Sequence, residues 1–473
     1  MLSARAFAFL CGLLLHYGNA YSRVTKPTTH QRAARHNLYS KADRVPDYVD
    51  SITPESSPST TFPLGRFAFS LLPLSPESVG RRKTICKEVV KDQIWTLDQV
   101  QGIINVNVPV RCVVVKLKDG GLMVNNPVAP TKETVDFVRD IENRHGKVKY
   151  ITLSSLGIEH KGTAGAFSSF FPSSSVYYQN GHYSFPLNLP TQLFFPWGKI
   201  VKEIPERAAD APWYDDLDHH CLGPLRPKGI GGFAETAFFH RATKTLLVTD
   251  AVIRVDDSPP EIINEDPRAL LYHARDFQEE IIADSKANRA KGWRRMVLFG
   301  LVFMPKGIEI YDTFDAIRRL KDVSNDMKKL GAGAVPYDGG LYPWKWVESE
   351  LPSFKALQGG LLVAPILRKL ILNREPERVL DWVDKVSKWP FQRIIPAHFA
   401  NDVKATPKDF TDAFSFLLEE EKGLRFGRSK VPAPLEGDMK TLSDASKALT
   451  AQNVLFEEAR LVNRLQFKQR AIR

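Results

Sequence analysis

The strongest limit on the fold comes from residues 148–162, where a short apolar strand runs directly into a polar loop. Residues 148–153 are rich in β-branched and aromatic side chains, and the preceding segment repeats its apolar residues at helical spacing, at Val135, Val138 and Ile141. Shorter β-rich runs fill residues 94–124. This order of strand, helix and strand predicts a layered α/β fold whose chemistry lies on the loops that follow the strands.

The loop at residues 155–162 reads Ser-Leu-Gly-Ile-Glu-His-Lys-Gly. It resembles the H-x-H-x-D-H-x-G loop of the metallo-β-lactamase superfamily, which also follows a hydrophobic strand. The last three functional positions match, with glutamate in place of aspartate, at Glu159, His160 and Gly162. Ser155 and Gly157 stand where the superfamily has its two leading histidines.

Two later segments resemble further blocks of the same superfamily in the same order. Residues 232–250 resemble its Gly-His-Thr-Pro-Gly block, hairpin and Thr-Gly-Asp strand end. Within them, Asp250 falls on the bridging carboxylate, whereas Phe233 replaces a histidine. Residues 377–398 resemble its closing helix, strand and Pro-Gly-His, with alanine for glycine and with His398 as the last residue.

The departures from the superfamily pattern fall on one half of its metal site. In the dinuclear members three histidines hold the first metal, and at those positions this chain has Ser155, Gly157 and Phe233. The residues implied to hold the second metal are Glu159, His160, Asp250 and His398. Two imidazoles and two carboxylates can hold one zinc, iron or manganese ion. The resemblance therefore implies one divalent metal ion, or none.

Each of these residues also has a purely structural interpretation. Asp250 could cap the turn after its strand, His398 could be a hydrogen-bonded loop residue, and Glu159 and His160 could be solvated. Glu235 is a replacement ligand or general base in one interpretation and a solvated strand residue in the other. The run Asp218-His219-His220-Cys221 could lend a ligand to the emptied half of the site, because imidazoles and thiolates bind such metals. Adjacent histidines lack the spacing that directs both at one ion, which favours an ordinary loop instead.

Two classes of function follow from these residues. In the first, the protein is a metal-dependent hydrolase of a small-molecule ester, thioester or phosphoester, with Asp250 and Glu235 as catalytic residues. In the second, it is a catalytically inactive scaffold or binding protein of the same fold. A redox role with iron, as in the flavodiiron relatives, would need two irons and a flavin domain. The closest resemblance is to the uncharacterised DUF4336 domain family of cyanobacteria, algae and plants, which has no assigned reaction.

The first ninety residues are predicted to form targeting signals and a linker rather than part of the folded domain. Residues 1–20 have the basic, apolar and small-residue pattern of a signal peptide, and residues 21–45 are basic and hydroxyl-rich, as transit peptides are. Residues 46–90 are predicted to be a low-complexity linker. The joined leader resembles those of algae with secondary plastids, which predicts a plastid (chloroplast) protein. Secretion is the alternative.

The rest of the chain is predicted to form one domain and a tail. Residues 91–402 are expected to be a four-layer αββα sandwich of the α/β class, with a long helical insertion at about 255–375. The insertion is either extra core or a lid over the site, and a helix is expected from Asp266 to about Lys286. Residues 403–473 are expected to be a C-terminal helical extension, with a helix from Lys440 to about Gln469.

Composition removes several classes of partner. Six basic and no acidic residues precede Asp43, so without residues 1–42 the net charge of +11 falls to +5, and no nucleic acid is expected. Arg368 and Lys369 interrupt the apolar stretch at residues 360–373, so no transmembrane segment is expected in the mature chain. The four cysteines share no C-x-x-C spacing, which argues against a disulfide framework or a zinc ribbon.

Overall fold

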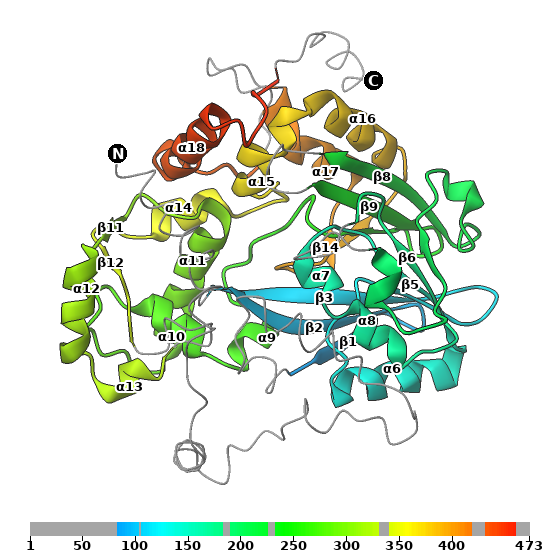
Figure 1. Ribbon diagram of the computed structural model, residues 1–473, viewed down its shortest axis with the longest axis horizontal. Coiled ribbons are helices and arrows are strands. Elements are labelled where there is room, and N and C mark those ends of the chain that lie inside the picture. The colour runs from blue at the N-terminus through cyan, green and yellow to red at the C-terminus, as the bar shows by residue number, and fades with distance from the viewer. Residues whose placement is uncertain are drawn as a thin grey trace.

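The computed structural model describes residues 83–103, 106–182, 190–225, 232–330, 340–418 and 431–459. The predicted signal peptide, the transit-like segment and the predicted linker as far as residue 82 lie outside these residues. Two β-sheets face each other, and helices cover the outer face of each sheet (Figure 1). This arrangement is the predicted αββα sandwich.

The first sheet has seven strands in the order β1-β2-β3-β4-β5-β6-β7. Strands β1 to β4 form an antiparallel meander, and β4 to β7 run parallel to one another. The strands are β1 (Ile85–Val90), β2 (Ile94–Ile103), β3 (Val106–Lys116), β4 (Leu122–Asn125), β5 (Val148–Leu153), β6 (Ser175–Tyr178) and β7 (Val201–Glu203). The parallel half requires a crossover, and helix α6 (Lys132–His145) supplies it between β4 and β5.

The second sheet has five strands in the order β14-β13-β10-β9-β8. They are β8 (Leu217–Leu225), β9 (Phe233–His240), β10 (Thr245–Val248), β13 (Arg393–Pro396) and β14 (Val403–Lys404). The central pair, β10 and β13, is parallel, and the other pairs are antiparallel. The carboxyl ends of β10 and β13 therefore meet at one edge of the sheet.

Three clusters of buried apolar side chains separate the four layers. Between the sheets lie Val113, Val115, Phe238, Leu247 and Ile395. Helices α6 and α8 (Ala164–Ser169) cover the first sheet with Val138, Ile141 and Phe167. Helices α16 (Pro376–Val386) and α17 (Pro407–Ala413) cover the second sheet with Val379, Val383, Phe410 and Phe414. The helical spacing of the apolar residues predicted α6 and α16 correctly, because each helix buries one face.

The predicted insertion between β10 and β13 is a helical layer beside the sandwich, seen at the left of Figure 1. Its elements are α9 (Glu261–Asn264), α10 (Arg268–Ala274), α11 (Lys286–Val302), β11 (Ile308–Ile310), α12 (Thr313–Arg319), η5 (Leu320–Asp322), α13 (Asn325–Lys328), β12 (Trp344–Trp346), α14 (Leu351–Ala356), α15 (Pro365–Leu370) and η6 (Leu372–Arg374). Helix α11 buries Trp293, Met296 and Leu301. Its Met296 sulfur accepts the backbone N–H of Asn107, which joins the insertion to the β2–β3 hairpin.

The remaining short elements lie on the loops and at the C-terminal end. They are α7 (Ile158–Lys161), η3 (Thr191–Phe194), η4 (Ala208–Asp210), η7 (Ser415–Leu417) and α18 (Glu436–Ala451). Thr406 caps helix α17, because its hydroxyl accepts the backbone N–H of Asp409. Among the residues that the structure describes, no helix combines the length and apolar character of a membrane span.

The structure differs from the predicted boundaries in four places. The sandwich continues past its predicted end at residue 402, because β14 pairs with β13 and Phe410 on α17 packs against the second sheet. Strand β1 extends the sheet into the predicted linker, because Ile85–Val90 pairs with the free edge of β2. The helix expected from Asp266 to Lys286 ends at Ala274, since Arg275 is extended and turns its guanidinium back over the Tyr272 ring. Helix α18 ends at Ala451 rather than near Gln469: the backbone N–H of Val454 bonds back to Leu449, and residues 460–473 lie outside the description.

Candidate metal centre

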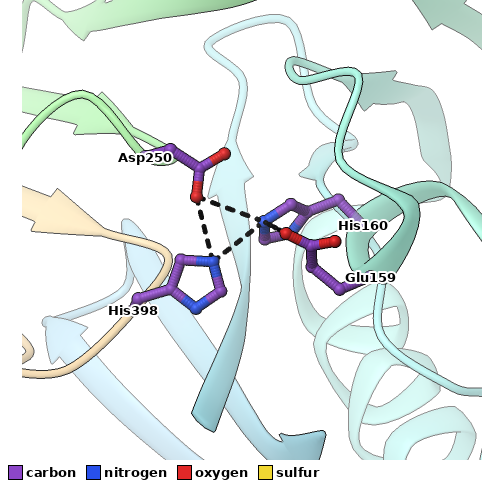
Figure 2. A group of neighbouring side chains, drawn as sticks. All are labelled: Glu159, His160, Asp250 and His398. Carbon is purple, nitrogen blue, oxygen red and sulfur yellow. Dashed lines mark hydrogen bonds and ion pairs between the residues drawn. The ribbon is translucent and has the colours of Figure 1, made fainter. Parts of the chain in front are cut away.

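Four side chains from three distant segments converge at one edge of the sandwich (Figure 2). Glu159, His160, Asp250 and His398 each offer one ligand atom, and these atoms all lie within 4.8 Å of one another. His398 Nε2 is 3.1 Å from Asp250 Oδ1 and 3.1 Å from His160 Nε2. His160 Nε2 is 3.9 Å from both Asp250 Oδ1 and Glu159 Oε1. The structure thus brings together all four residues predicted as metal ligands.

The strand order explains this convergence. Glu159 and His160 lie on α7, shortly after β5, whereas Asp250 and His398 each follow the parallel strands β10 and β13 by two residues. The backbone N–H of Thr236 on β9 donates to the Ser154 carbonyl at 2.7 Å, which fastens the loop after β5 to the second sheet. The ends of β5, β10 and β13 are therefore held at a common edge.

The four residues fit a metal ion. Ligand atoms about 2.0–2.1 Å from a tetrahedral zinc ion lie roughly 3.3 Å from one another, close to the two 3.1 Å separations. His398 Nδ1 lies 2.8 Å from the Pro109 carbonyl oxygen, and a proton on Nδ1 leaves the Nε2 lone pair directed at the cluster. Two Nε2 atoms this close need a cation or a proton between them, because two lone pairs repel.

Asp250 and His398 each favour the charged form of the other. Burial alone would raise the pKa of Asp250, but its contacts with the His160 and His398 imidazoles outweigh burial and hold this pKa below its usual range. Burial alone would lower the pKa of His398, but its contact with Asp250 outweighs burial and raises the pKa. A carboxylate that stays ionised beside two imidazoles is a typical metal-binding arrangement.

The positions of the three missing histidines are occupied in different ways. Ser155 Oγ donates to Asp250 Oδ2 at 3.1 Å, so a hydroxyl satisfies the oxygen that would face the first metal. A Cβ on Gly157 would lie 2.9 Å from Glu159 Oε1, which places the glutamate carboxylate beside this glycine. Phe233 is buried in the apolar cluster under α16. None of the three supplies a strong metal ligand.

Gly157 has no side chain, which leaves space for the Glu159 carboxylate beside the cluster. We expect Gly157→Ala to lower zinc affinity about tenfold, or about 1.4 kcal/mol, because the added Cβ would lie 2.9 Å from Glu159 Oε1 and 3.1 Å from His160 Cδ2 and would displace both ligands. Competition titration with a chromogenic chelator measures this change. The double variant Gly157→Ala with Glu159→Asp should recover part of the affinity, and Gly300→Ala, whose Cβ would have no neighbour closer than 3.7 Å, should leave it unchanged. Unaltered affinity in Gly157→Ala would contradict this role.

Glu235 does not join the cluster. It is fully buried on β9, and its two carboxylate oxygens accept the backbone N–H groups of Thr249 at 2.8 Å and Asp250 at 2.9 Å. Burial and the negative charge of Asp250 raise its pKa to about 8, although these backbone donors oppose the shift. The prediction of a solvated strand residue was wrong. The position also does not favour a ligand or general base, since the carboxylate is engaged in shaping the turn that carries Asp250.

The polar run at residues 218–221 lies on strand β8 rather than in the expected loop. His219 is fully buried, with Nε2 2.7 Å from the Pro205 carbonyl, and His220 stacks on Trp389. Cys221 Sγ lies 3.5 Å from Thr236 Oγ1. Each of these side chains therefore has a partner within strand β8 or beside it. Within the described residues Cys86, Cys112 and Cys221 are free thiols.

Two facing sheets flanked by helices, with ligand-bearing loops at one edge, make this a protein of the metallo-β-lactamase fold. The model of one domain family matches residues 91–416, more than half of the chain. The chain belongs to that family, which is described as Domain of unknown function (DUF4336).

Solved structures with this fold resemble the chain only distantly. A mutant of the flavo di-iron protein from Thermotoga maritima is 10% identical with a TM-score of 0.35, and the match covers 72% of this chain and 64% of that protein, which is less than two thirds of its length. The DIM-1 metallo-β-lactamase is 11% identical with a TM-score of 0.34, covering 71% and 97%. A metallo-β-lactamase from Pontibacter korlensis is 10% identical with a TM-score of 0.28, covering 58% and 99%. No curated protein matches the chain.

Proposed function

We propose that the protein is a mononuclear metal-dependent hydrolase of a small-molecule ester, thioester or phosphoester. The observation that carries this proposal is the convergence of four ligand atoms within 4.8 Å on one half of the site. On the other half, serine, glycine and phenylalanine stand in place of the superfamily's histidines. One ion rather than two is the consequence.

One zinc, iron or manganese ion would be held by His160, Asp250 and His398, with Glu159 as the fourth ligand. When bound, such an ion lowers the pKa of a water molecule to about 7 and polarises a carbonyl or phosphoryl oxygen. Asp250 keeps both imidazoles directed inward through Oδ1 and is itself oriented by the Ser155 hydroxyl on Oδ2. These contacts hold the site in shape before a substrate arrives.

Glu159 is the candidate for proton transfer in this centre. Its side chain is 27% exposed, against 18% for Asp250, 10% for His398 and 0% for His160. The Glu159 oxygen that does not serve as a ligand, at the solvent side of the cluster, can accept the proton that the attacking water loses and deliver it to the leaving group. We propose this role for Glu159 in place of Glu235, whose carboxylate faces backbone donors.

The test is turnover of chromogenic ester, thioester and phosphodiester substrates by the zinc-, iron- or manganese-loaded protein. We expect hydrolysis of one class, and a loss of about 10²-fold or more in kcat for Glu159→Gln, measured at a metal concentration that saturates both proteins because Glu159 is also a ligand. Glu265→Gln, which removes a surface carboxylate paired with Lys83, serves as the control. A loaded wild type without hydrolysis, or a folded wild type that binds no metal, would contradict the proposal and favour a scaffold or binding protein.

We further propose delivery to a plastid, on the basis of the leader pattern in residues 1–45. A fusion of these residues to a fluorescent protein, expressed in an alga with secondary plastids, should accumulate in the plastid. A fusion of residues 21–45 alone should stay outside it, because the signal peptide is the first of the two addresses. Fluorescence in the medium for the longer fusion would instead indicate secretion.

A further inference from the structure

A buried arginine in the first sheet lies against the loop that carries His398. Arg111 is on β3, and only 1% of its surface is exposed. Its Nε and Nη2 donate to the two carboxylate oxygens of Asp98, on the neighbouring strand β2, at 2.7 and 3.0 Å. This is a two-pronged arginine–carboxylate pair, the geometry that holds a guanidinium most rigidly.

The remaining donors of Arg111 all reach backbone carbonyls around His398. Nη1 donates to Pro396 and, at 3.4 Å, to Ala400, and Nη2 donates to Phe399 at 3.1 Å. A guanidinium has five N–H groups, and these bonds use every one of them. Since the three carbonyls lie on both sides of His398 in the sequence, the guanidinium fixes the loop that presents this histidine.

Two more bonds connect the same stretch of β3 to the loop. The backbone N–H of Arg111 donates to the Ala397 carbonyl at 2.9 Å, and the Pro109 carbonyl lies 2.8 Å from His398 Nδ1. Phe399, the residue after His398, has a φ of +58°, which a bulky side chain rarely adopts without support. The carbonyl bond from Arg111 to Phe399 supplies that support directly beside the ligand.

Stability alone does not account for this pair. Moving two charges out of water costs about as much as their attraction returns, so apolar residues of similar volume would stabilise the sandwich equally well. Apolar residues, however, cannot hold three carbonyl oxygens at fixed positions. The Arg111–Asp98 pair is therefore better explained by a need to position His398 than by a need to stabilise the core.

We propose that Arg111, oriented by Asp98, is a positioning residue that sets the direction of the His398 imidazole and so tunes the metal affinity of the centre. This inference rests on the proposed metal centre. Groups that orient metal ligands without touching the ion typically change affinity by about 10- to 100-fold when they are replaced. The change in metal affinity should arise from the position of the His398 imidazole.

The test compares Arg111→Lys with Arg295→Lys in the full chain. Lysine keeps the charge but lacks the fork that reaches Asp98 and the loop together. Arg295 on α11 is a matched control: it is 3% exposed, pairs with Glu350 and Asp276, and donates to the Arg275 carbonyl at 2.7 Å within the insertion. Zinc affinity is measured by chelator competition, coordination by the visible absorption of the cobalt(II) form, and stability by denaturant unfolding.

We expect Arg111→Lys to lower zinc affinity about 10- to 100-fold and to alter the cobalt spectrum. Arg295→Lys should lower stability while leaving affinity and spectrum unchanged. If Arg111→Lys does not fold, Asp98→Asn, which leaves the guanidinium in place, should lower zinc affinity several-fold with the same spectral change. A wild type that binds one zinc, with unchanged affinity and spectrum in the folded Arg111 or Asp98 variant, overturns the inference alone. A wild type that binds no zinc overturns the metal centre and the inference together.

Discussion

The double variant Asp250→Ala, His398→Ala is expected to lose its metal completely. Elemental analysis of the chain expressed from Pro46 should give about one equivalent of zinc, iron or manganese for the wild type and a background amount for the variant. Four zinc ligands together supply roughly 10–16 kcal/mol, so removing two should weaken binding by at least about 10⁴-fold. The 3.1 Å separations at His398 Nε2 make these two residues the centre of the ligand set.

The control for this variant removes another aspartate and histidine that contact each other. Asp92 and His145 lie 3.6 Å apart, on the β1–β2 turn and at the end of α6. The variant Asp92→Asn, His145→Ala should therefore keep its full equivalent of metal. Equal metal content in all three proteins would mean adventitious binding, and a folded, metal-free wild type would exclude the centre.

Glu235→Ala is expected to cause the largest loss of stability, about 2–6 kcal/mol of the free energy of unfolding. The carboxylate accepts the backbone N–H groups of Thr249 and Asp250, and no other acceptor replaces it in alanine. Each buried donor left without a partner costs about 1–3 kcal/mol. This loss is a large part of the roughly 5–15 kcal/mol that stabilises an ordinary domain.

Denaturant unfolding followed by circular dichroism measures this loss. Glu235→Gln should cost less than alanine, because the amide oxygen still accepts at least one of the backbone bonds. Glu265→Ala, which removes a surface carboxylate paired with Lys83, should change stability by less than about 1 kcal/mol. If Glu235→Ala were as stable as Glu265→Ala, the carboxylate would not be what holds the Asp250 turn.

The candidate ligands could be predicted from the sequence because each follows a strand within a short, ordered motif. Ser155 and Arg111 were harder to interpret, since their partners lie far along the chain: Arg111 and the Pro396 carbonyl are 285 residues apart. Arg111 did leave a signal, as the only charged residue in the apolar run from Val108 to Val115. A charge in a strand buried on both faces has to find partners inside the fold.

Local patterns also failed where tertiary contacts decided the structure. The polar residues at positions 218–221 favoured a loop. Alternate residues of a strand can face different environments, however, and His219 lies in the core while Asp218 is only half-buried. The long helix expected after Asp266 stops because the side chain of Arg275 finds aromatic rings and carbonyls in the insertion. The partners that decide each outcome lie partly outside the segment, as Pro205 does for His219 and Tyr342 does for Arg275.

Phe399 gives the insertion a thermodynamic link to the centre. Its ring lies 5.9 Å from that of Trp293 on α11, while its backbone neighbour His398 offers a ligand atom and Arg111 holds its carbonyl. An ion that binds the folded loop but not the unfolded chain stabilises the elements that pack against that loop. The free energy of unfolding rises by about 1.4 kcal/mol for each tenfold excess of the ion concentration over Kd. Metal binding would therefore slow proteolysis of the helical insertion, although the insertion contributes none of the four ligands. Shortening the insertion would in turn lower the affinity of the centre for the ion.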